Sequence, residues 1–521
     1  MWSDGAGGGP GRTPPRTAFF KGPDIVTAGI VAGGFALRLF ALTKRGLWLD
    51  EALGVQAASL PGLSAMLKAV SQEIHPPLFY LLLRAWMSVF GGLDLAVRLF
   101  AAVWGGLGIY GVYFLCRAGL AWSRKASDLA AAFAAVLPLH AYYSQEVRPY
   151  VVIFALACFS LGFLFRAPRT GKFSDYALFG LGQAAVLYLH HTAILYCLSL
   201  NVLYLLALVL FREADRRRLL GLVSAGAISF VLYLPWLPIF FRQLKNPTIF
   251  TGFRFWVPVP APSDFFDALA KIAGIWKWNL AHPLSVFVGA LIWVPLLFFL
   301  ICGISRLGER SQARTFVLAS ATLAYPLFIY FLSHALVPVW LLRILAPAAV
   351  GVPVTAALGV EHRIFAKRKF PLIAAVAFCL GVNLFTSLNL LGTYQKENWK
   401  ELAAYLSQNL KTGDSVQVYR EYYAVPLERY TPRGVPISRV HVASDRRDED
   451  LSVTLASEIL NLGENAGTIY LVLAGSDVPA DRLLFLLKDK FTLRERRGFL
   501  GGELYVLRTS LSHAGPEKDF P

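Results

Sequence analysis

Long apolar runs alternate with short polar segments along most of this chain. Eleven of the runs hold roughly 16 to 23 residues, the length that crosses a bilayer as a helix. Polarity does not alternate residue by residue within them, so they predict helices and not the strands of a barrel. They lie at 24–43, 95–116, 127–143, 149–166, 175–190, 192–211, 219–241, 284–304, 315–332, 343–360 and 371–392. The predicted class is a polytopic α-helical membrane protein.

The apolar segment 76–90 predicts an interfacial or re-entrant helix. It has about 15 residues and begins with Pro76-Pro77, and a run of that length is too short for an ordinary span. If it does not cross, the Arg- and Lys-rich loops all fall on one side of the membrane. The positive-inside rule makes that side cytoplasmic. Segments 44–94 and 242–283 and everything after about residue 393 then lie on the outer side.

The pattern changes at the two ends of the chain. Residues 1–23 are rich in Gly, Pro and Arg and predict a disordered cytoplasmic tail. After residue 393 charges become frequent, Trp399 to Leu410 has helical spacing, and Ser415–Tyr419 and Thr468–Leu473 predict strands. We therefore expect a transmembrane domain over 24–393 and a small outer α/β domain over 394–521.

Composition supports a membrane protein and excludes several other classes. The chain has 521 residues, of which 56% are hydrophobic, and a formal net charge of +17. The positive-inside pattern accounts for that charge, so we expect membrane lipids and no nucleic acid as partners. The five cysteines lie in apolar spans without CxxC spacing and predict packing residues. No P-loop, dinucleotide fingerprint, HExxH or GxSxG motif stands in a useful context.

The acidic pair Asp50–Glu51 follows the first predicted span, in the run Leu47-Trp48-Leu49-Asp50-Glu51. Carboxylates at a membrane boundary are costly to keep near lipid, so they point to function. A carboxylate in a medium of low dielectric constant can act as a general base. The alternative is a pair that reaches for water at a helix end.

Two further outer segments carry candidate residues. His75 precedes Pro76-Pro77 and could bind a phosphate, orient a carboxylate, ligate a metal or serve only the structure. In the run from Tyr143 to Tyr150, Glu146 and Arg148 combine a carboxylate with a guanidinium. That combination suits a sugar hydroxyl and a phosphate, and its alternative is an ion pair that closes a helix end.

Two other positions complete the candidates. His190 and His191 lie between two spans, where a structural polar contact is favoured over a metal site. Arg343 opens an apolar span, where its charge opposes the helix dipole unless an anion binds there. A phosphate would resolve that conflict, and snorkelling is the alternative.

Three of these motifs, in their order and spacing, resemble a known superfamily. Trp48-Leu49-Asp50-Glu51, His75-Pro76-Pro77-Leu78 and the run from Tyr143 to Tyr150 are similar to bacterial membrane glycosyltransferases of the GT-C fold. The nearest groups are the protein O-mannosyltransferases and the lipid A aminoarabinose transferases. The resemblance covers about residues 24–350. One motif differs, because the Arg-Tyr-Leu of many relatives is Arg343-Ile344-Leu345 here.

The resemblance implies an activity and residue roles. Such enzymes move a sugar from a polyprenyl-phosphate donor to a lipid, glycan or protein acceptor at the outer face, here of a bacterial inner membrane, facing the periplasm. By that match Asp50 is the catalytic base with Glu51 beside it, and Arg148 and Arg343 bind the donor phosphate. Some relatives bind a divalent metal, for which no ligand set is evident in this chain.

We expect inverting transfer by single displacement, with His75, Tyr143, Glu146 and His191 as further substrate-binding residues. The competing hypothesis is a transporter or flippase for a polyprenyl-linked lipid. A transporter usually places polar residues near mid-membrane, whereas the candidates here collect on the outer side. A structural membrane scaffold would explain neither the acidic pair nor Arg343.

Overall fold

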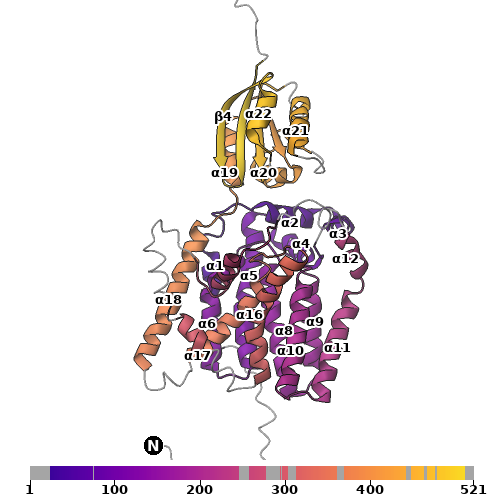
Figure 1. The fold of residues 1–521 in the computed structure, drawn as a ribbon. Coiled ribbons are helices and arrows are strands. Elements are labelled where there is room, and N and C mark those ends of the chain that lie inside the picture. The colour runs from indigo at the N-terminus through magenta and orange to yellow at the C-terminus, as the bar shows by residue number, and fades with distance from the viewer. Residues whose placement is uncertain are drawn as a thin grey trace, which may run out of the picture.

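In the computed structural model, a body of helices carries a small α/β domain at one end (Figure 1). The structure describes residues 24–73, 75–245, 257–276, 294, 296–302, 312–360, 369–441, 448–462, 466–475 and 478–510. The predicted tail 1–23 and most of the predicted span 284–304 lie outside these residues.

Four helices of the described residues are long and apolar enough to cross a membrane. They are α5 (Asp94–Phe114) with the π-turn η1 (Leu115–Gly119), α8 (Tyr150–Thr170), α10 (Ala193–Leu210) and α18 (Lys369–Thr393). A fifth candidate is the pair α11 (Arg216–Tyr233) and α12 (Leu237–Leu244), which bend by 73° at their junction. All five coincide with predicted spans.

The other predicted spans in the described residues are shorter or interrupted, except one. In these spans lie α1 (Ile25–Leu39), α6 (Arg124–Val136), α7 (Pro138–Tyr143), α9 (Phe173–Leu187), α16 (Gln312–Ala335), the 3₁₀ turn η2 (Ala346–Val350) and α17 (Gly351–Val360). The helix α14 (Pro262–Ile272) lies in the predicted outer segment 242–283, where no span is predicted. The predicted span 127–143 is broken because Pro138 cannot donate a backbone hydrogen bond, so α6 ends and α7 begins there. Only α16 covers its predicted span, 315–332, with one uninterrupted helix of 24 residues.

Three short helices lie at the end of the helical body that faces the α/β domain (Figure 1). They are α2 (Leu49–Ser59), α3 (Gly62–Gln72) and α4 (Leu78–Phe90). The helix α4 has 13 residues, about 20 Å at 1.5 Å per residue, which is too short to cross a bilayer. It ends at Gly91, whose φ of 80° is open to glycine without strain. The segment 76–90 therefore forms the short helix that its length predicts.

Glycines on α5 let the candidate residues approach the helix axis closely. A Cβ at Gly108 would lie 2.7 Å from Nε2 of His140, and one at Gly105 would overlap the Ser144 side chain. Small residues at such positions allow helices to pack without a gap in a membrane. The loop that follows α7 is thereby held against α5.

The C-terminal domain contains a five-stranded mixed sheet in the order β2-β1-β3-β5-β4. The strands are β1 (Ser415–Tyr419), β2 (Ile437–Val440), β3 (Thr468–Ala474), β4 (Phe491–Phe499) and β5 (Gly502–Thr509). β1 pairs in parallel with β2 and β3, whereas β5 pairs antiparallel with β3 and β4. β1 and β3 confirm both strands that the sequence predicts.

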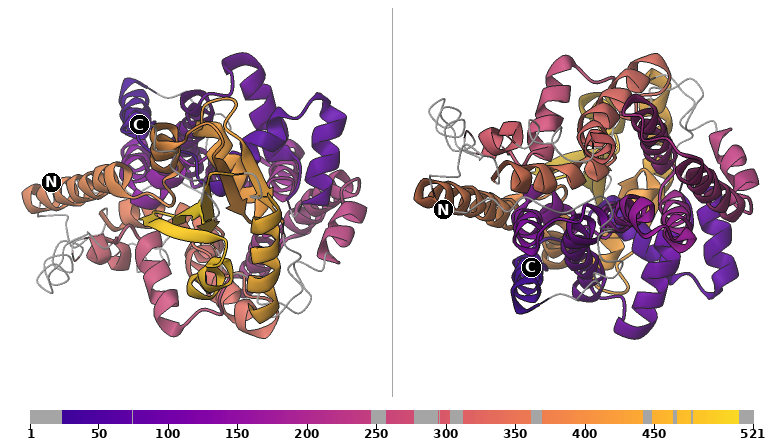
Figure 2. Two further views of the ribbon diagram at one scale, coloured as in Figure 1. Left: turned by 90° about the horizontal axis from the view of Figure 1, so that it is seen from above. Right: turned by 90° about the horizontal axis from the view of Figure 1, so that it is seen from below.

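Helices cover both faces of this sheet. α19 (Trp399–Asn409) and α20 (Ala424–Tyr430), which follows the 3₁₀ turn η4 (Glu421–Tyr423), pack on one face around Trp399. α21 (Asp448–Leu462) and α22 (Ala480–Leu487) pack on the other face. Seen along the long axis, the domain lies over the middle of the helical body (Figure 2).

Candidate active site

Asp50 lies in the first turn of α2 and faces two arginines that are distant in sequence. Its Oδ2 atom is 3.1 Å from Nη1 of Arg343 and 4.0 Å from Nη2 of Arg148. The Asp50 side chain is 27% exposed, whereas those of Arg148 and Arg343 are 5% and 15% exposed. A reachable carboxylate thus stands in front of two largely buried positive charges.

The backbone and His75 fix the direction of the Arg148 guanidinium. Its Nη1 donates to the backbone oxygen of Asp50 at 3.1 Å, and its Nη2 lies 3.2 Å from Nε2 of His75. Burial and the neighbouring Arg148 lower the pKa of His75 well below its usual value, so the ring is neutral and accepts that bond. His75 therefore orients the guanidinium of Arg148.

Both arginines stay charged in spite of their burial. Burial lowers the pKa of Arg148, but Asp50 and nearby tyrosines raise it more, so that it lies above the usual value. The same opposing causes, with Tyr150 the largest that raises it, leave the pKa of Arg343 above its usual value. Two guanidinium charges against one carboxylate leave an excess of positive charge that can receive an anion.

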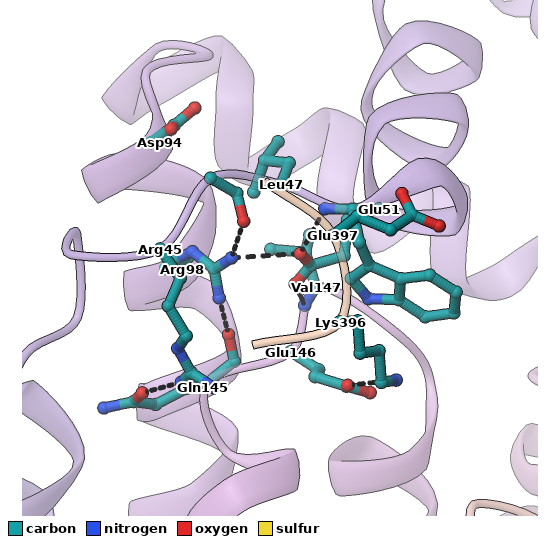
Figure 3. Close-up of polar contacts among 12 residues, drawn as sticks. Arg45, Leu47, Glu51, Asp94, Arg98, Gln145, Glu146, Val147, Lys396 and Glu397 are labelled. Atoms are coloured by element: carbon teal, nitrogen blue, oxygen red, sulfur yellow. Dashed lines mark hydrogen bonds and ion pairs between the residues drawn. The ribbon is translucent and has the colours of Figure 1, made fainter. Parts of the chain in front are cut away.

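Glu51 has different surroundings from its neighbour Asp50. It is fully buried and accepts hydrogen bonds from Nη2 of Arg98 at 3.0 Å, Trp48 N at 3.2 Å and Val147 N at 2.8 Å. Arg98 also donates to the backbone oxygens of Gln145 and Gly46, which completes the network in Figure 3. This carboxylate ties α2 to the segment that carries Arg148.

Glu146 binds a lysine that the sequence did not single out. Tyr142 donates its hydroxyl to Oε1 of Glu146 at 2.6 Å, and Lys396 forms an ion pair with the same oxygen. Burial raises the pKa of Glu146, but Lys396, Tyr142 and Arg343 together lower it more, so the carboxyl stays ionised. The Lys396 ammonium also lies 3.8 Å from the centroid of the Trp48 ring. Lys396 comes from the segment between α18 and α19, so the outer domain's connection reaches the site.

The Tyr143 ring lies between two other tyrosine rings, with centroids 5.2 Å from Tyr142 and 5.6 Å from Tyr150. Tyr143 is buried among these aromatic rings.

The two adjacent histidines point to different places. His190 lines a cavity with Tyr150 and Arg343, and its ring centroid is 5.2 Å from that of His75. His191 instead hydrogen-bonds to Oε1 of Gln243 through Nε2 at 2.8 Å. The structure thus brings His190, and not the predicted His191, beside the Asp50 cluster. Consecutive residues of a turn cannot share one direction, and the sequence does not say which of them faces inward.

Arg38 and Arg98 are not among the candidates from the sequence, although the sequence contains a signal for both. They stand within the predicted spans 24–43 and 95–116, and an ionisable residue within a span is a candidate site residue by default. Arg38 is buried and donates to Ser144 Oγ at 3.1 Å and to the backbone oxygens of Gly34 and Ala135. Lys396 gave no such signal, because a lysine after a helix is ordinary.

An apolar cavity of about 340 Å³ lies along α14, α16 and α17. Its lining includes Leu269, Leu300, Leu323 and Val352, and Thr322 stands one turn from Tyr325, which lines the cavity at Arg343. The helix α16 and the run from η2 to α17 therefore line both the apolar cavity and the cavity at Arg343.

Metal ligands do not gather at this site. Within the described residues there is no group of three or more His, Cys, Asp or Glu side chains that could hold a metal ion. The charge available to an anion there comes from arginine.

Comparison with known proteins gives a family match over part of the chain. Residues 74–239 match the family described as dolichyl-phosphate-mannose-protein mannosyltransferase. This segment contains His75, Glu146, Arg148 and His191. No curated protein sequence matches the chain.

Solved structures share the fold over almost the whole chain. ArnT from Cupriavidus metallidurans in the apo state has a TM-score of 0.62 at 13% identity, covering 92% of this chain and 97% of that one. ArnT bound to undecaprenyl phosphate has a TM-score of 0.56 at 14% identity, covering 94% and 99%. The arabinofuranosyltransferase AftD from Mycobacteria has a TM-score of 0.53 at 14% identity, covering 94% and 40%.

These findings confirm the resemblance to the GT-C membrane glycosyltransferases. The helical body and the C-terminal sheet together form an ArnT-like fold. The family match covers less than half of the chain, and it relates the segment 74–239 to the dolichyl-phosphate-mannose-protein mannosyltransferases.

Proposed function

We propose that this protein transfers a sugar from a polyprenyl-phosphate donor to a lipid, glycan or protein acceptor at the outer face of the membrane. The single observation that supports this best is the contact of Asp50 with both Arg148 and Arg343. A base and a site for a leaving phosphate then stand side by side. Transfer needs the base close to the attacking hydroxyl and the phosphate site close to the bond that breaks, so the two must lie next to each other.

The chemistry follows from that geometry. Asp50 takes the proton of an acceptor hydroxyl as its oxygen attacks the anomeric carbon. The bond from that carbon to the phosphate oxygen breaks, and the electron pair leaves with the phosphate. Arg148 and Arg343 stabilise the charge that develops on the leaving group. Because attack and departure occur on opposite faces, a single displacement inverts the anomeric configuration.

The remaining candidates support this centre. Glu51 is a positioning residue that joins α2 to the segment of Arg148, and His75 orients the Arg148 guanidinium. Glu146 lines a small cavity with Trp48 and Tyr142, and the Tyr143 ring packs against that of Tyr142. His191 is joined through Gln243 to the end of α3.

The prenyl chain of the donor fits the apolar cavity along α14, α16 and α17. Long hydrocarbon chains favour such a lining because it removes their surface from water. The cavity shares α16 with the cationic cavity, so a phosphate at Arg343 can connect to a chain lying there. ArnT has been solved with undecaprenyl phosphate bound, which is a lipid of this kind.

Eleven membrane spans within residues 24–393 suit this function, with the basic loops in the cytoplasm and the active site outside. The tail 1–23 would then be cytoplasmic, and the domain 394–521 would lie in the periplasm of a bacterial inner membrane. This orientation puts the helix α2, which carries Asp50, and the outer domain on one side, where the two elements lie together (Figure 1).

Turnover of labelled donors tests the function. Purified protein receives polyprenyl phosphates that carry different labelled sugars, with membrane extract as the acceptor. A glycosyltransferase releases free carrier phosphate and moves the label into the extract. Binding of carrier lipid without consumption of any donor would contradict the proposal and favour the transporter or flippase.

A further inference from the structure

In the parallel part of the outer sheet, the order in which the chain adds strands reverses between β1 and β3. From β1 the chain passes through α20 to β2 at the sheet edge, and then through α21 to β3 on the other side of β1. α20 and α21 belong to the cores on opposite faces. In open α/β sheets, ligands bind outside the carboxyl ends of the strands at such a point of reversal.

These carboxyl ends point toward the helical body. The turn η4 and the helix α20, which follow β1 directly, lie against α2, the helix of Asp50. Tyr430 at the end of α20 accepts a hydrogen bond from Leu47 N at 2.6 Å. Figure 1 shows the same arrangement, with α20 at the side of the domain that faces α2. The binding edge of the outer sheet and the carboxylate of Asp50 therefore belong to neighbouring elements.

The residues after β1 form a cluster of aromatic and charged groups, Arg420 to Tyr423. Arg420 has a φ of 58°, a conformation that is strained for a residue with a side chain. Its Nη1 lies 3.3 Å from the hydroxyl of Tyr422, and the rings of Tyr422 and Tyr423 are 4.9 Å apart. The Tyr422 side chain is 39% exposed, so one ring presents a face to an incoming group.

The other two parallel strands contribute at the same edge. His441 follows β2, and its Nδ1 is 3.3 Å from the carboxylate of Glu421. Gly475 follows β3, where a Cβ would lie 2.2 Å from the Tyr423 hydroxyl, so only glycine leaves room for that ring. All three strand ends thus meet around the pair Tyr422 and Tyr423.

We propose that this edge, Arg420 to Tyr423 with His441, binds a sugar ring of the acceptor and delivers its hydroxyl toward Asp50. The proposal rests on the proposed function and names the acceptor as a carbohydrate. A tyrosine ring offers an apolar face for the C–H side of a sugar and a polar tip for its hydroxyls. The guanidinium, carboxylate and imidazole at the same edge provide the few polar contacts that fix a ligand's orientation.

The local sequence argues against a nucleotide at this edge. The nucleotide-binding sheets of this kind place a glycine-rich turn after the first strand, so that the backbone can approach a phosphate. Here the turn reads Arg420-Glu421-Tyr422-Tyr423, without glycine. Bulky aromatic residues there favour stacking over the close backbone approach that a phosphate needs.

Transfer kinetics of the full chain test the site. The variant is Tyr422→Ala, and the control is Phe485→Ala, which removes a ring 63% exposed on α22 of the same domain. We expect Tyr422→Ala to raise the acceptor concentration at half-maximal transfer about tenfold. A tenfold change corresponds to about 1.4 kcal/mol of binding free energy. The maximal rate and the affinity for the donor stay unchanged, and the control matches the wild type. Tyr422→Phe keeps the ring and most of the acceptor affinity.

Direct binding separates this inference from the proposed function. Saturation-transfer NMR uses methyl glycosides of hexoses and of hexuronic acids, and, in another sample, a peptide rich in serine and threonine. Contact of the sugars with the protein, lost in Tyr422→Ala and kept in Phe485→Ala, supports the site even when no donor of the panel is consumed. Equal acceptor dependence in wild type and Tyr422→Ala, or binding of the peptide alone at this edge, would overturn it.

Discussion

Asp50 and Glu51 are adjacent, but their carboxylates have opposite surroundings because successive residues of a helix point about 100° apart. Asp50 is partly exposed and meets Arg148 and Arg343, while Glu51 is buried against Arg98. The exposed carboxylate can meet a substrate, and the buried one can hold the chain. One acidic pair thus supplies a candidate base and an anchor.

The anchoring role of Glu51 predicts a loss of stability. Glu51→Gln leaves the buried Arg98 without its counter-charge, which costs about 3 kcal/mol in such pairs. We expect thermal unfolding of the purified variant in detergent to occur well below that of the wild type. Asp481→Asn, at an exposed position on α22, serves as the control and changes little. Wild-type stability of Glu51→Gln together with complete loss of transfer would contradict this and give Glu51 a part in the chemistry.

The sequence located most of the candidate site but not its connections. Asp50, His75, Glu146, Arg148 and Arg343 were all singled out, and the structure brings them into one region. A motif cannot show which of two adjacent side chains faces inward. The sequence therefore predicts Glu51 and His191 as site residues, although each of them binds a partner outside the Asp50 cluster. Lys396 was missed because only the folded chain brings it to Glu146.

The start of the helix α2 is bound by the segment that leads into the outer domain. At its start, Leu49 N donates to Oε2 of Glu397 at 2.8 Å, and Trp399 donates its Nε1 proton to the same oxygen at 2.6 Å. Burial raises the pKa of Glu397, and the two hydrogen bonds favour its ionised form. A carboxylate at a helix N-terminus is stabilising because it meets the positive end of the dipole. The position of Asp50 therefore depends on the segment that leads into the outer domain.

Hydropathy predicted the long spans well and the short helices less well. Its window finds α5, α8, α10 and α18 because each carries about 20 apolar residues in one helix. It cannot see that Pro138 divides 127–143, or that α1 and α9 have only 15 helical residues each. Those boundaries depend on hydrogen bonds and packing, which composition does not record.

The burial of His191 predicts sensitivity to acid. Burial lowers the pKa of His191 to about 4, and the unfolded chain has a pKa near 6.5. As the pH falls from 6.5 to 4, the unfolded state takes up a proton that the folded state does not, so the free energy of unfolding decreases. Each unit of difference is worth about 1.4 kcal/mol, which gives up to about 3 kcal/mol here.

Replacing this residue should remove that part of the acid sensitivity. His191→Gln can still donate to Gln243, whose amide donates to the backbone oxygens of Val70 and Glu73 at the end of α3. We expect the unfolding temperature of the variant to fall less than that of the wild type between pH 6.5 and 4. Parallel decreases in both proteins would show that His191 does not carry this dependence.

One acidic residue at the start of α5 binds several groups of the outer domain. Asp94 accepts hydrogen bonds from Nε of Arg429 and from the Tyr430 hydroxyl, both at 2.8 Å, and Lys400 lies 3.4 Å away. Three groups of the outer domain thus converge on one carboxylate. This attachment keeps the carboxyl edge of the sheet, with Tyr422, over α2.

Removal of that carboxylate should loosen the domain. Asp94→Ala costs about 2 kcal/mol of interface stability, because hydrogen bonds to charged groups are worth about 1.5–3 kcal/mol each. We expect hydrogen exchange of the amides in α20 and in the segment 394–398 to become more than tenfold faster. Asp481→Ala, an exposed acid on α22, leaves the exchange unchanged. Unchanged exchange in Asp94→Ala would mean that other contacts hold the domain.

The effect of Asp50→Asn on donor use tests the central claim most directly. Asparagine has nearly the same shape but cannot take a proton from the acceptor, and Arg148 and Arg343 remain to bind a phosphate. We expect transfer from a labelled polyprenyl-phosphate sugar to fall at least 100-fold, the range of general-base catalysis, while the carrier phosphate binds as tightly as before or more tightly. Transfer at the wild-type rate in Asp50→Asn would contradict the assignment of Asp50 as the base.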